Sequence, residues 1–121
     1  MTSEEKKAYL LLKSVIFNYH GLDEDEQEIL DETADSIDGH DELAWASDFI
    51  SEDYYNAFER ARNYLKDAVQ PFDKEKRLSN LSMVWEANNK KGYISEMEAT
   101  AMLKLAKDWE VESDFIKMIK S

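Results

Sequence analysis

The sequence predicts an all-α fold: a single compact domain, residues 1–121, of six or seven helices. Three glycines and one proline in 121 residues leave few places where a helix would be interrupted. Helix-favouring Ala, Leu, Glu, Lys and Met are abundant, and runs of β-branched residues are absent. Apolar residues make up 43% of the chain, which is typical of a globular protein with a real core.

The first helix is expected from about Glu4 to Tyr19. Its apolar side chains recur at helical spacing, at Ala8, Leu11, Leu12, Val15 and Tyr19, with Tyr9 and Ile16 beside them. An apolar arc this broad predicts a central helix that several others contact. Gly21 is expected to stop this helix.

The second helix is expected to begin after Asp23. Asp23 as the N-cap and Glu26 three residues later form the pattern of a capping box. The predicted buried positions are Leu30, Ala34 and Ile37. "DG" at residues 38–39 is expected to end the helix, with the glycine in the left-handed position after its last turn.

Two helices are expected in the middle of the chain. A short helix around Glu42–Phe49 would present Leu43, Trp45 and Phe49 to the core. Ser51 is the predicted cap of a longer helix, and Pro71 closes it because the residue before a proline avoids helical geometry. The buried stripe of this longer helix is expected at Tyr54, Phe58, Ala61, Leu65 and Ala68.

Three helices are expected in the last part of the chain. The first lies within residues 72–89, with Leu78, Leu81 and Trp85 turned inward. A second capping box, Ser95 with Glu98, opens the next. Its predicted core positions are Met102, Ala106 and Trp109. Val111 is expected to staple a short last helix that carries Phe115, Ile116 and Ile119.

Two segments, "HGLDEDEQEIL" and "KGYISEMEATAML", share one pattern: Gly, an apolar residue, a cap, two residues, Glu, and a helix. Superposing the caps pairs Asp23 with Ser95, Glu26 with Glu98, Leu22 with Ile94, Leu30 with Met102, and Ala34 with Ala106. The chain is therefore expected to hold two related helical hairpins, and chance likeness of two ordinary helix starts stays as the alternative.

The stretch "NNKKGYISEMEA", residues 88–99, also resembles the back half of an EF-hand calcium loop. Such a loop needs oxygen ligands at its first, third and fifth positions, which here fall on Ala87, Asn89 and Lys91. A methyl group cannot ligate and an ammonium repels the ion, so we expect no EF-hand. The structural interpretation makes Gly92 the turn and Ile94 the staple before the Ser95 cap.

The charge of the chain is strongly asymmetric. Formal net charge is −12, yet residues 14–59 hold fifteen Asp or Glu and no Lys or Arg. Such a segment disfavours direct contact with nucleic acid or an anionic membrane, and it favours a basic protein surface as partner.

The acidic residues of the second helix recur at helical spacing and gather on its outer face. With their neighbours, the candidate partner-binding residues are Glu28, Asp31, Glu32, Asp35, Asp38, Asp41 and Glu42. Three interpretations stay open: a solvated face partly paired with Arg60, Arg62 or Lys66, a surface for a basic partner, or weak divalent-cation binding. The metal candidates are Asp35, Asp38, His40 and Asp41, and a histidine near the negative end of a helix dipole is the structural alternative.

Several classes of chemistry lack their residues. Without cysteine there are no disulfides, zinc knuckles or thiol reactions. No Gly-x-Ser-x-Gly, phosphate loop or paired Glu-x-x-His is present, so we expect no catalytic residues and no cofactor. A carboxylate acid–base enzyme stays as an alternative. Lys13 interrupts the apolar run "AYLLL", so neither a membrane span nor a signal peptide is expected, and the expected location is cytoplasmic.

The aromatic residues are expected mainly in the core. Trp45, Trp85 and Trp109 lie on the predicted apolar stripes. In "EDYYNAF" an exposed Tyr54 or Tyr55 would serve an interface.

The doubled motif, in "GLDEDEQEIL" and "GYISEMEATAMLKLAKDWEV", resembles the TerB-like domain over roughly residues 5–120. That bacterial domain is found in tellurite-resistance proteins and at the front of some membrane-associated co-chaperones. The resemblance implies a compact helical domain with an acidic face in a stress-response setting and no settled enzymatic role. The family usually has Asp-Gly at both turns, whereas this chain has His20-Gly21 and Lys91-Gly92. Glu26 and Glu98 match the family's glutamates, but the missing aspartates weaken a metal site carried over from it.

Two functional hypotheses follow. The first is a non-enzymatic TerB-like domain whose acidic face, centred on residues 28–42, binds a partner protein or weakly binds cations. The alternative is an acidic mimic of nucleic acid that occupies a partner's basic groove. A docking face needs exposed apolar or aromatic residues among the acids, whereas mimicry needs carboxylates spaced like phosphates. A homodimer stays open.

Overall fold

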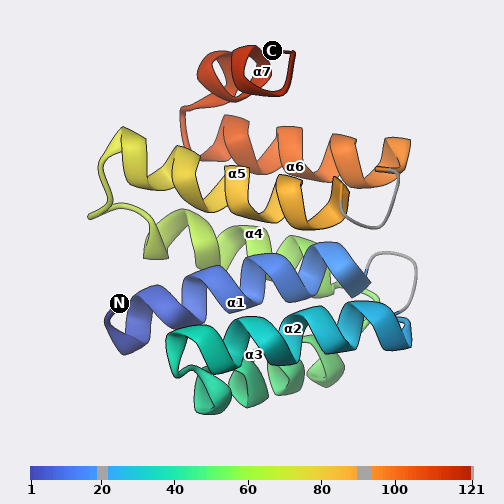
Figure 1. Ribbon diagram of the computed structural model, residues 1–121. Coiled ribbons are helices and arrows are strands. Elements are labelled where there is room, and N and C mark those ends of the chain that lie inside the picture. The colour runs from blue at the N-terminus through green and yellow to red at the C-terminus, as the bar shows by residue number, and fades with distance from the viewer. Residues whose placement is uncertain (19–21, 90–93, 121) are drawn as a thin grey trace. The chain divides into compact units, whose positions relative to one another are not determined.

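The computed structural model describes residues 1–18, 22–89 and 94–120, and every regular element in these ranges is an α-helix (Figure 1). The helices are α1 (Ser3–Phe17), α2 (Glu24–Ile37), α3 (His40–Glu52), α4 (Ala57–Ala68), α5 (Lys74–Asn89), α6 (Glu96–Asp108) and α7 (Glu112–Lys120). The all-α prediction is confirmed. The chain divides into two compact units, Met1–Leu65 and Lys66–Ser121, and the division falls inside α4.

In the first unit, α1 packs against both α2 and α3, and these two pack against each other (Figure 1). All residues from Ala8 to Phe17 are buried, which confirms the predicted central helix. The side chain of Thr2 caps α1 by accepting a hydrogen bond from the Glu5 amide at 3.1 Å. Tyr19 and Gly21, the predicted end of this helix, lie outside the described residues.

The capping box of α2 forms as predicted. The Glu26 amide donates to Asp23 Oδ1 at 2.7 Å, and the Asp23 amide donates to Glu26 Oε1 at 3.3 Å. Leu30 and Ala34 are buried, and Ile37 is half-buried.

The corner between α2 and α3 differs from the prediction. Asp38, not Gly39, takes the left-handed conformation, with φ of 54°, whereas φ of Gly39 is −122°. Aspartate is one of the few residues that tolerate this conformation. The absence of a side chain at Gly39 leaves room for its neighbours, because a Cβ there would lie 3.0 Å from Cδ1 of Leu10 and 3.1 Å from Cγ1 of Ile37. Lys6 Nζ donates to the Asp38 carbonyl at 2.9 Å and so caps the end of α2.

A helix lies around Glu42–Phe49 as predicted, but the predicted start of α4 at Ser51 was wrong. The expected short helix Glu42–Phe49 is longer at both ends, and Ser51 lies inside it. The Ser51 hydroxyl donates to the carbonyls of Ser47 at 2.9 Å and Asp48 at 3.3 Å, a bond within a helix that removes it as an N-cap. Tyr54 therefore lies in the turn before α4. At its other end α4 stops at Ala68, shortly before Pro71, as predicted.

In the second unit, α5, α6 and α7 pack against one another in all three pairs. The second capping box also forms: the Glu98 amide donates to Ser95 Oγ at 3.1 Å, and the Ser95 amide donates to Glu98 Oε1 at 3.2 Å. This confirms the capped helix start, while Lys91 and Gly92 lie outside the described residues. The buried predicted positions are Leu81, Met102, Ala106, Trp109, Val111 and Phe115, and the half-buried ones are Leu78, Trp85, Ile116 and Ile119.

The two units repeat one three-helix pattern at a separation of 72 residues. The N-cap Ser95 lies 72 residues after the N-cap Asp23. The first residues of α6 and α7 lie 72 residues after the first residues of α2 and α3, and the last residue of α5 lies 72 residues after the last residue of α1. The only non-glycine residues with positive φ among those described, Asp38 and Glu110, stand at the same separation. The sequence pattern predicted two related helical hairpins, and the helix boundaries and turns correspond over three helices in each unit.

The burial pattern repeats at the same separation. All five buried positions of α5 match buried positions of α1; in order the pairs are Ala8 and Asn80, Tyr9 and Leu81, Leu12 and Val84, Val15 and Ala87, and Ile16 and Asn88. Leu30 and Ala34 of α2 match Met102 and Ala106 of α6. The capping glutamates also match, since Glu26 is 5% exposed and Glu98 is 1% exposed. The two units thus share helix boundaries, turns and a set of buried positions, with different sequences.

Candidate docking surface of the first unit

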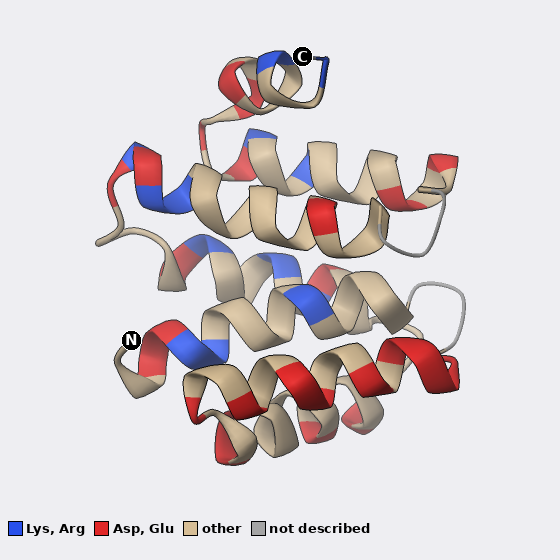
Figure 2. Cartoon of the chain, viewed as in Figure 1, with Lys and Arg blue, Asp and Glu red and all other residues tan. Residues whose placement is uncertain are grey.

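Carboxylates gather on α2 and α3 of the first unit (Figure 2). Six of the seven predicted partner-binding residues are exposed, and we call them the acidic face: Glu28, Asp31, Glu32, Asp35, Asp38 and Asp41. The seventh, Glu42, is half-buried. The exposure predicted from helical spacing is confirmed for the acidic face.

Few neighbouring groups offset this charge. Gln27 Nε2 donates to Asp31 Oδ1 at 3.1 Å, and the His40 ring meets Asp35 at 2.5 Å with both side chains exposed. The Ser3 hydroxyl donates to Glu42 at 2.7 Å, and this hydrogen bond lowers the pKa of the Glu42 carboxyl. Glu42 is therefore already engaged at the start of α1.

One open interpretation paired acids of α2 with Arg60 or Arg62, both on α4, and no such ion pair with the acidic face is seen among the described residues. Arg60 lies 3.5 Å from Glu52, and Arg62 lies 3.2 Å from Glu59. The lysines of the first unit have other contacts: Lys6 with the Asp38 carbonyl, Lys7 with Glu4 at 3.7 Å, and Lys13, which is buried, with Thr33 at 2.7 Å. In the part of the chain that the structure describes, the His40 contact with Asp35 is the one ion pair that involves the acidic face, and its carboxylates are exposed to solvent.

The metal candidates are not gathered into a cluster. Of Asp35, Asp38, His40 and Asp41, only Asp35 and His40 are seen in contact. Within residues 1–18, 22–89 and 94–120, no group of three or more His, Asp or Glu could hold a metal ion.

In the second unit, α6 is the counterpart of α2 and has no acids at the positions that match the outer carboxylates of α2. At the 72-residue separation, Glu28, Asp31, Glu32 and Asp35 of α2 correspond to Thr100, Leu103, Lys104 and Lys107 of α6. Two carboxylates are thus replaced by ammonium groups on an otherwise matching helix. The fold does not require acids at these positions.

A hollow of about 240 Å³ opens beside the turn between α3 and α4. It is lined by Val15, Asn18, Ile50, Tyr54, Tyr55, Ala57 and Phe58. Tyr54 is 53% exposed and Tyr55 is 99% exposed, so the expected role of these tyrosines in the core is wrong, and the alternative of exposed tyrosines holds. Periodicity missed the hollow because it assigned Tyr54 to a helix.

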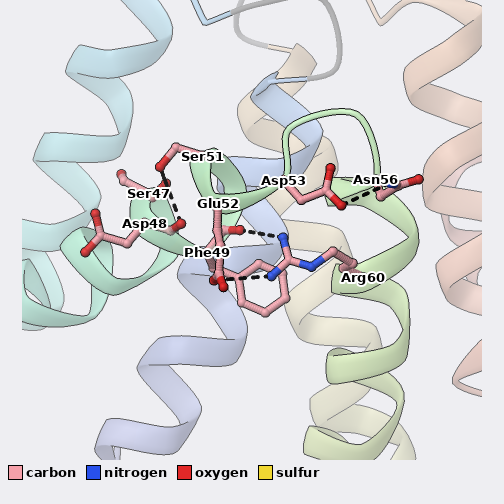
Figure 3. Close-up of polar contacts among 8 residues, drawn as sticks. All are labelled: Ser47, Asp48, Phe49, Ser51, Glu52, Asp53, Asn56 and Arg60. Atoms are coloured by element: carbon pink, nitrogen blue, oxygen red, sulfur yellow. Dashed lines mark hydrogen bonds and ion pairs between the residues drawn. The ribbon is translucent and has the colours of Figure 1, made fainter.

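Polar contacts fix the turn that carries the two tyrosines (Figure 3). Arg60 Nη1 donates to the Phe49 carbonyl at 2.8 Å, and its guanidinium stacks 4.4 Å from the centre of the Phe49 ring. Asn56 Nδ2 donates to Asp53 at 3.0 Å within the turn. The Tyr54 hydroxyl donates to the Asn18 carbonyl at 3.1 Å, which ties the turn to the end of α1.

Of the three tryptophans expected in the core, one is buried and the other two, Trp45 and Trp85, are half-buried. Trp109 is buried, and Trp85 meets the Phe115 ring edge-on at 5.7 Å. Trp45 lies 5.2 Å from the Tyr64 ring, and burial, with a smaller contribution from the charge of Glu4, raises the pKa of the Tyr64 hydroxyl.

Comparison with protein-family models, with curated proteins and with solved structures found no match to this chain. Among the described helices, none has the length and apolar composition that crossing a bilayer requires.

Proposed function

We propose that this protein is a non-enzymatic docking module whose acidic face binds a basic segment of a partner protein. The acidic face is a row of exposed carboxylates that neighbouring cations do not neutralise. A Lys- or Arg-rich segment is the partner that such a row attracts, because charge complementarity accelerates encounter and sets register.

The observation that carries this proposal is the difference between two matched helices. α2 and α6 share a capping box, buried core positions and a left-handed turn at their ends. α6 achieves this with Lys104 and Lys107 where α2 has Glu32 and Asp35. Since the scaffold forms with either charge, the acids of α2 serve something other than folding.

The energetics point the same way. Glu28 with Glu32, and Asp31 with Asp35, are like-charge pairs at i,i+4 spacing, which destabilise an isolated helix by roughly 0.2–0.5 kcal/mol each. A binding role for these carboxylates would explain why α2 carries like-charge pairs that destabilise it.

The exposed tyrosines support docking over mimicry of nucleic acid. Tyr54 and Tyr55 follow Glu52 and Asp53 directly, so aromatic surface lies beside acids. A protein-binding surface uses such aromatic contacts, whereas a mimic needs only phosphate-like spacing of carboxylates.

The resemblance to TerB-like domains adds a setting to this proposal: a bacterial cytoplasm and a response to tellurite or related stress. Growth on tellurite with and without the gene tests this setting, and equal growth would count against it while leaving the docking proposal to the next experiment.

The docking proposal is tested with tagged full-length chains in a pull-down at low and high salt. One variant neutralises the acidic face by Glu28→Gln, Asp31→Asn, Glu32→Gln and Asp35→Asn. The control neutralises four exposed acids of the second unit by Asp67→Asn, Glu75→Gln, Glu86→Gln and Glu112→Gln. We expect salt-sensitive partners to be lost with the first variant and kept with the control. Identical partners for wild type and both variants would refute an acidic docking face.

A further inference from the structure

The hollow at the α3–α4 turn has the size and lining of a site for one side chain. Its volume of about 240 Å³ is below the roughly 300–1,000 Å³ of pockets that enclose small molecules. Val15, Ile50 and Phe58 give it apolar walls. Central pockets of this kind accept the anchor residues that carry most of the binding energy in protein interfaces.

The rim of the hollow is held in place before any partner arrives. The Tyr54 hydroxyl is bonded to Asn18, and Arg60 joins the two helices on either side of the turn. A pre-organised surface loses less conformational entropy on binding. Tyr55 extends fully into solvent, and tyrosine is enriched at protein interfaces because its ring offers apolar area and its hydroxyl a polar end.

The charges around the hollow select a basic partner. Glu52 and Asp53 precede the tyrosines, and no Lys or Arg occurs between Ser14 and Glu59. The C-terminal ends of α1 and α3 lie on the same side of the first unit as the N-terminal end of α2 (Figure 1). The first turn of α2 is acidic (Figure 2). Arg60, whose guanidinium lies over the Phe49 ring, is paired with Glu52. A phosphate-bearing ligand would meet repulsion here.

We propose that the hollow receives one apolar side chain of the partner protein, from a segment in which Lys or Arg flank that side chain. The inference rests on the proposed docking function and adds the anchor to it. The apolar side chain fills the hollow against Tyr54 and Phe58, Tyr55 covers it, and the flanking cations meet the carboxylates of the first unit.

The probe is a panel of fluorescein-labelled peptides of the form Lys-Arg-Gly-X-Gly-Lys-Arg, in which X is Phe, Leu, Ala or Gly. Binding to the full chain is measured by fluorescence anisotropy, and the site is located from amide shifts in ¹H–¹⁵N spectra. We expect the Phe and Leu peptides to bind about tenfold tighter than the Gly peptide, the factor for an anchor residue. The largest shifts are expected around Ile50 and residues 54–58.

Tyr55→Ser is the decisive variant, because a side chain that is 99% exposed is not packed against the rest of the protein. It should remove most of the preference for Phe over Gly. Met97→Ser, at an exposed apolar position of the second unit, is the matched control and should leave the preference unchanged.

Each outcome separates this inference from the proposed function. Salt-sensitive binding with equal affinity for all four peptides, lost when the acidic face is neutralised, overturns the anchor and supports the docking function. A preference for Phe together with affinities that do not change when the acidic face is neutralised supports the anchor and refutes the docking function. No binding by any peptide at millimolar concentration overturns the anchor.

Discussion

Replacing Glu110 by glycine should stabilise the protein. Glu110 follows α6 with φ of 61°, and a side chain with a Cβ adopts this left-handed conformation at a cost of roughly 1–2 kcal/mol. Glycine is free of that cost but loses more backbone entropy on folding, roughly 0.5–1 kcal/mol. The difference predicts a gain of about 0.5–1 kcal/mol in the free energy of unfolding. The bond from the Val111 amide to the Ala106 carbonyl, at 2.9 Å, needs only backbone atoms and is retained.

Urea denaturation of Glu110→Gly and Glu110→Ala measures this effect. Both variants remove the same charge from the negative end of α6. The difference between their free energies of unfolding therefore reports the backbone conformation of residue 110 and not its charge. With a slope of about 2 kcal/mol per molar urea, the glycine variant should unfold at a midpoint on the order of 0.3 M higher than the alanine variant. A glycine variant less stable than the alanine variant by about 1 kcal/mol would place residue 110 in right-handed helix and refute the reasoning.

Three further predictions concern the core and the caps. Gly39→Ala should lower the free energy of unfolding by about 1–3 kcal/mol, because its Cβ would press on Leu10, and an unchanged urea midpoint would contradict this close packing. Asp23→Ala and Ser95→Ala should each cost about 1 kcal/mol, and a loss at one cap alone would contradict their equivalence. Burial raises the pKa of the Tyr9 hydroxyl above its ordinary value of 10.0. The unfolded chain therefore loses this proton at a lower pH than the folded protein does, so the free energy of unfolding falls as the pH rises past 10 toward the raised pKa. Tyr9→Phe should therefore lose less stability between pH 9 and 11 than the wild type does, and equal losses would argue against a buried tyrosine.

Local signals predicted those parts of the fold that depend on local bonds. A capping box involves four consecutive residues, so Asp23 with Glu26 and Ser95 with Glu98 could be identified from spacing alone. The buried stripes of α2 and α6 follow from helical period in the same way.

The errors lie where local signals compete or where contacts between helices decide. Ser51 has the composition of a cap, but its hydroxyl bonds to carbonyls within its own helix, an arrangement equally open to serine. Gly39 was expected to be left-handed because it is glycine. Its small size is used instead against Leu10, a residue distant in sequence, and Asp38 takes the turn.

The same distinction applies to the two parts of the docking surface. Four carboxylates of the acidic face follow from helical spacing on α2, and the other two, Asp38 and Asp41, lie in the turn after it and at the start of α3. The hollow depends on Tyr54 and Phe58 meeting Val15 of α1, and no pattern along the chain records that meeting. The one sequence signal for an interface near the hollow was the pair Tyr54 and Tyr55 in an acidic segment.

Two copies of one helical pattern in a single chain can differ in sequence, whereas the two subunits of a homodimer cannot. In a symmetric pair of identical chains each substitution appears on both subunits, so an acidic helix would be presented twice. Here the carboxylates occupy α2, while lysines stand at the matching positions of α6. A partner that recognises the acidic face therefore finds it once per chain, and one chain is expected to bind one partner segment.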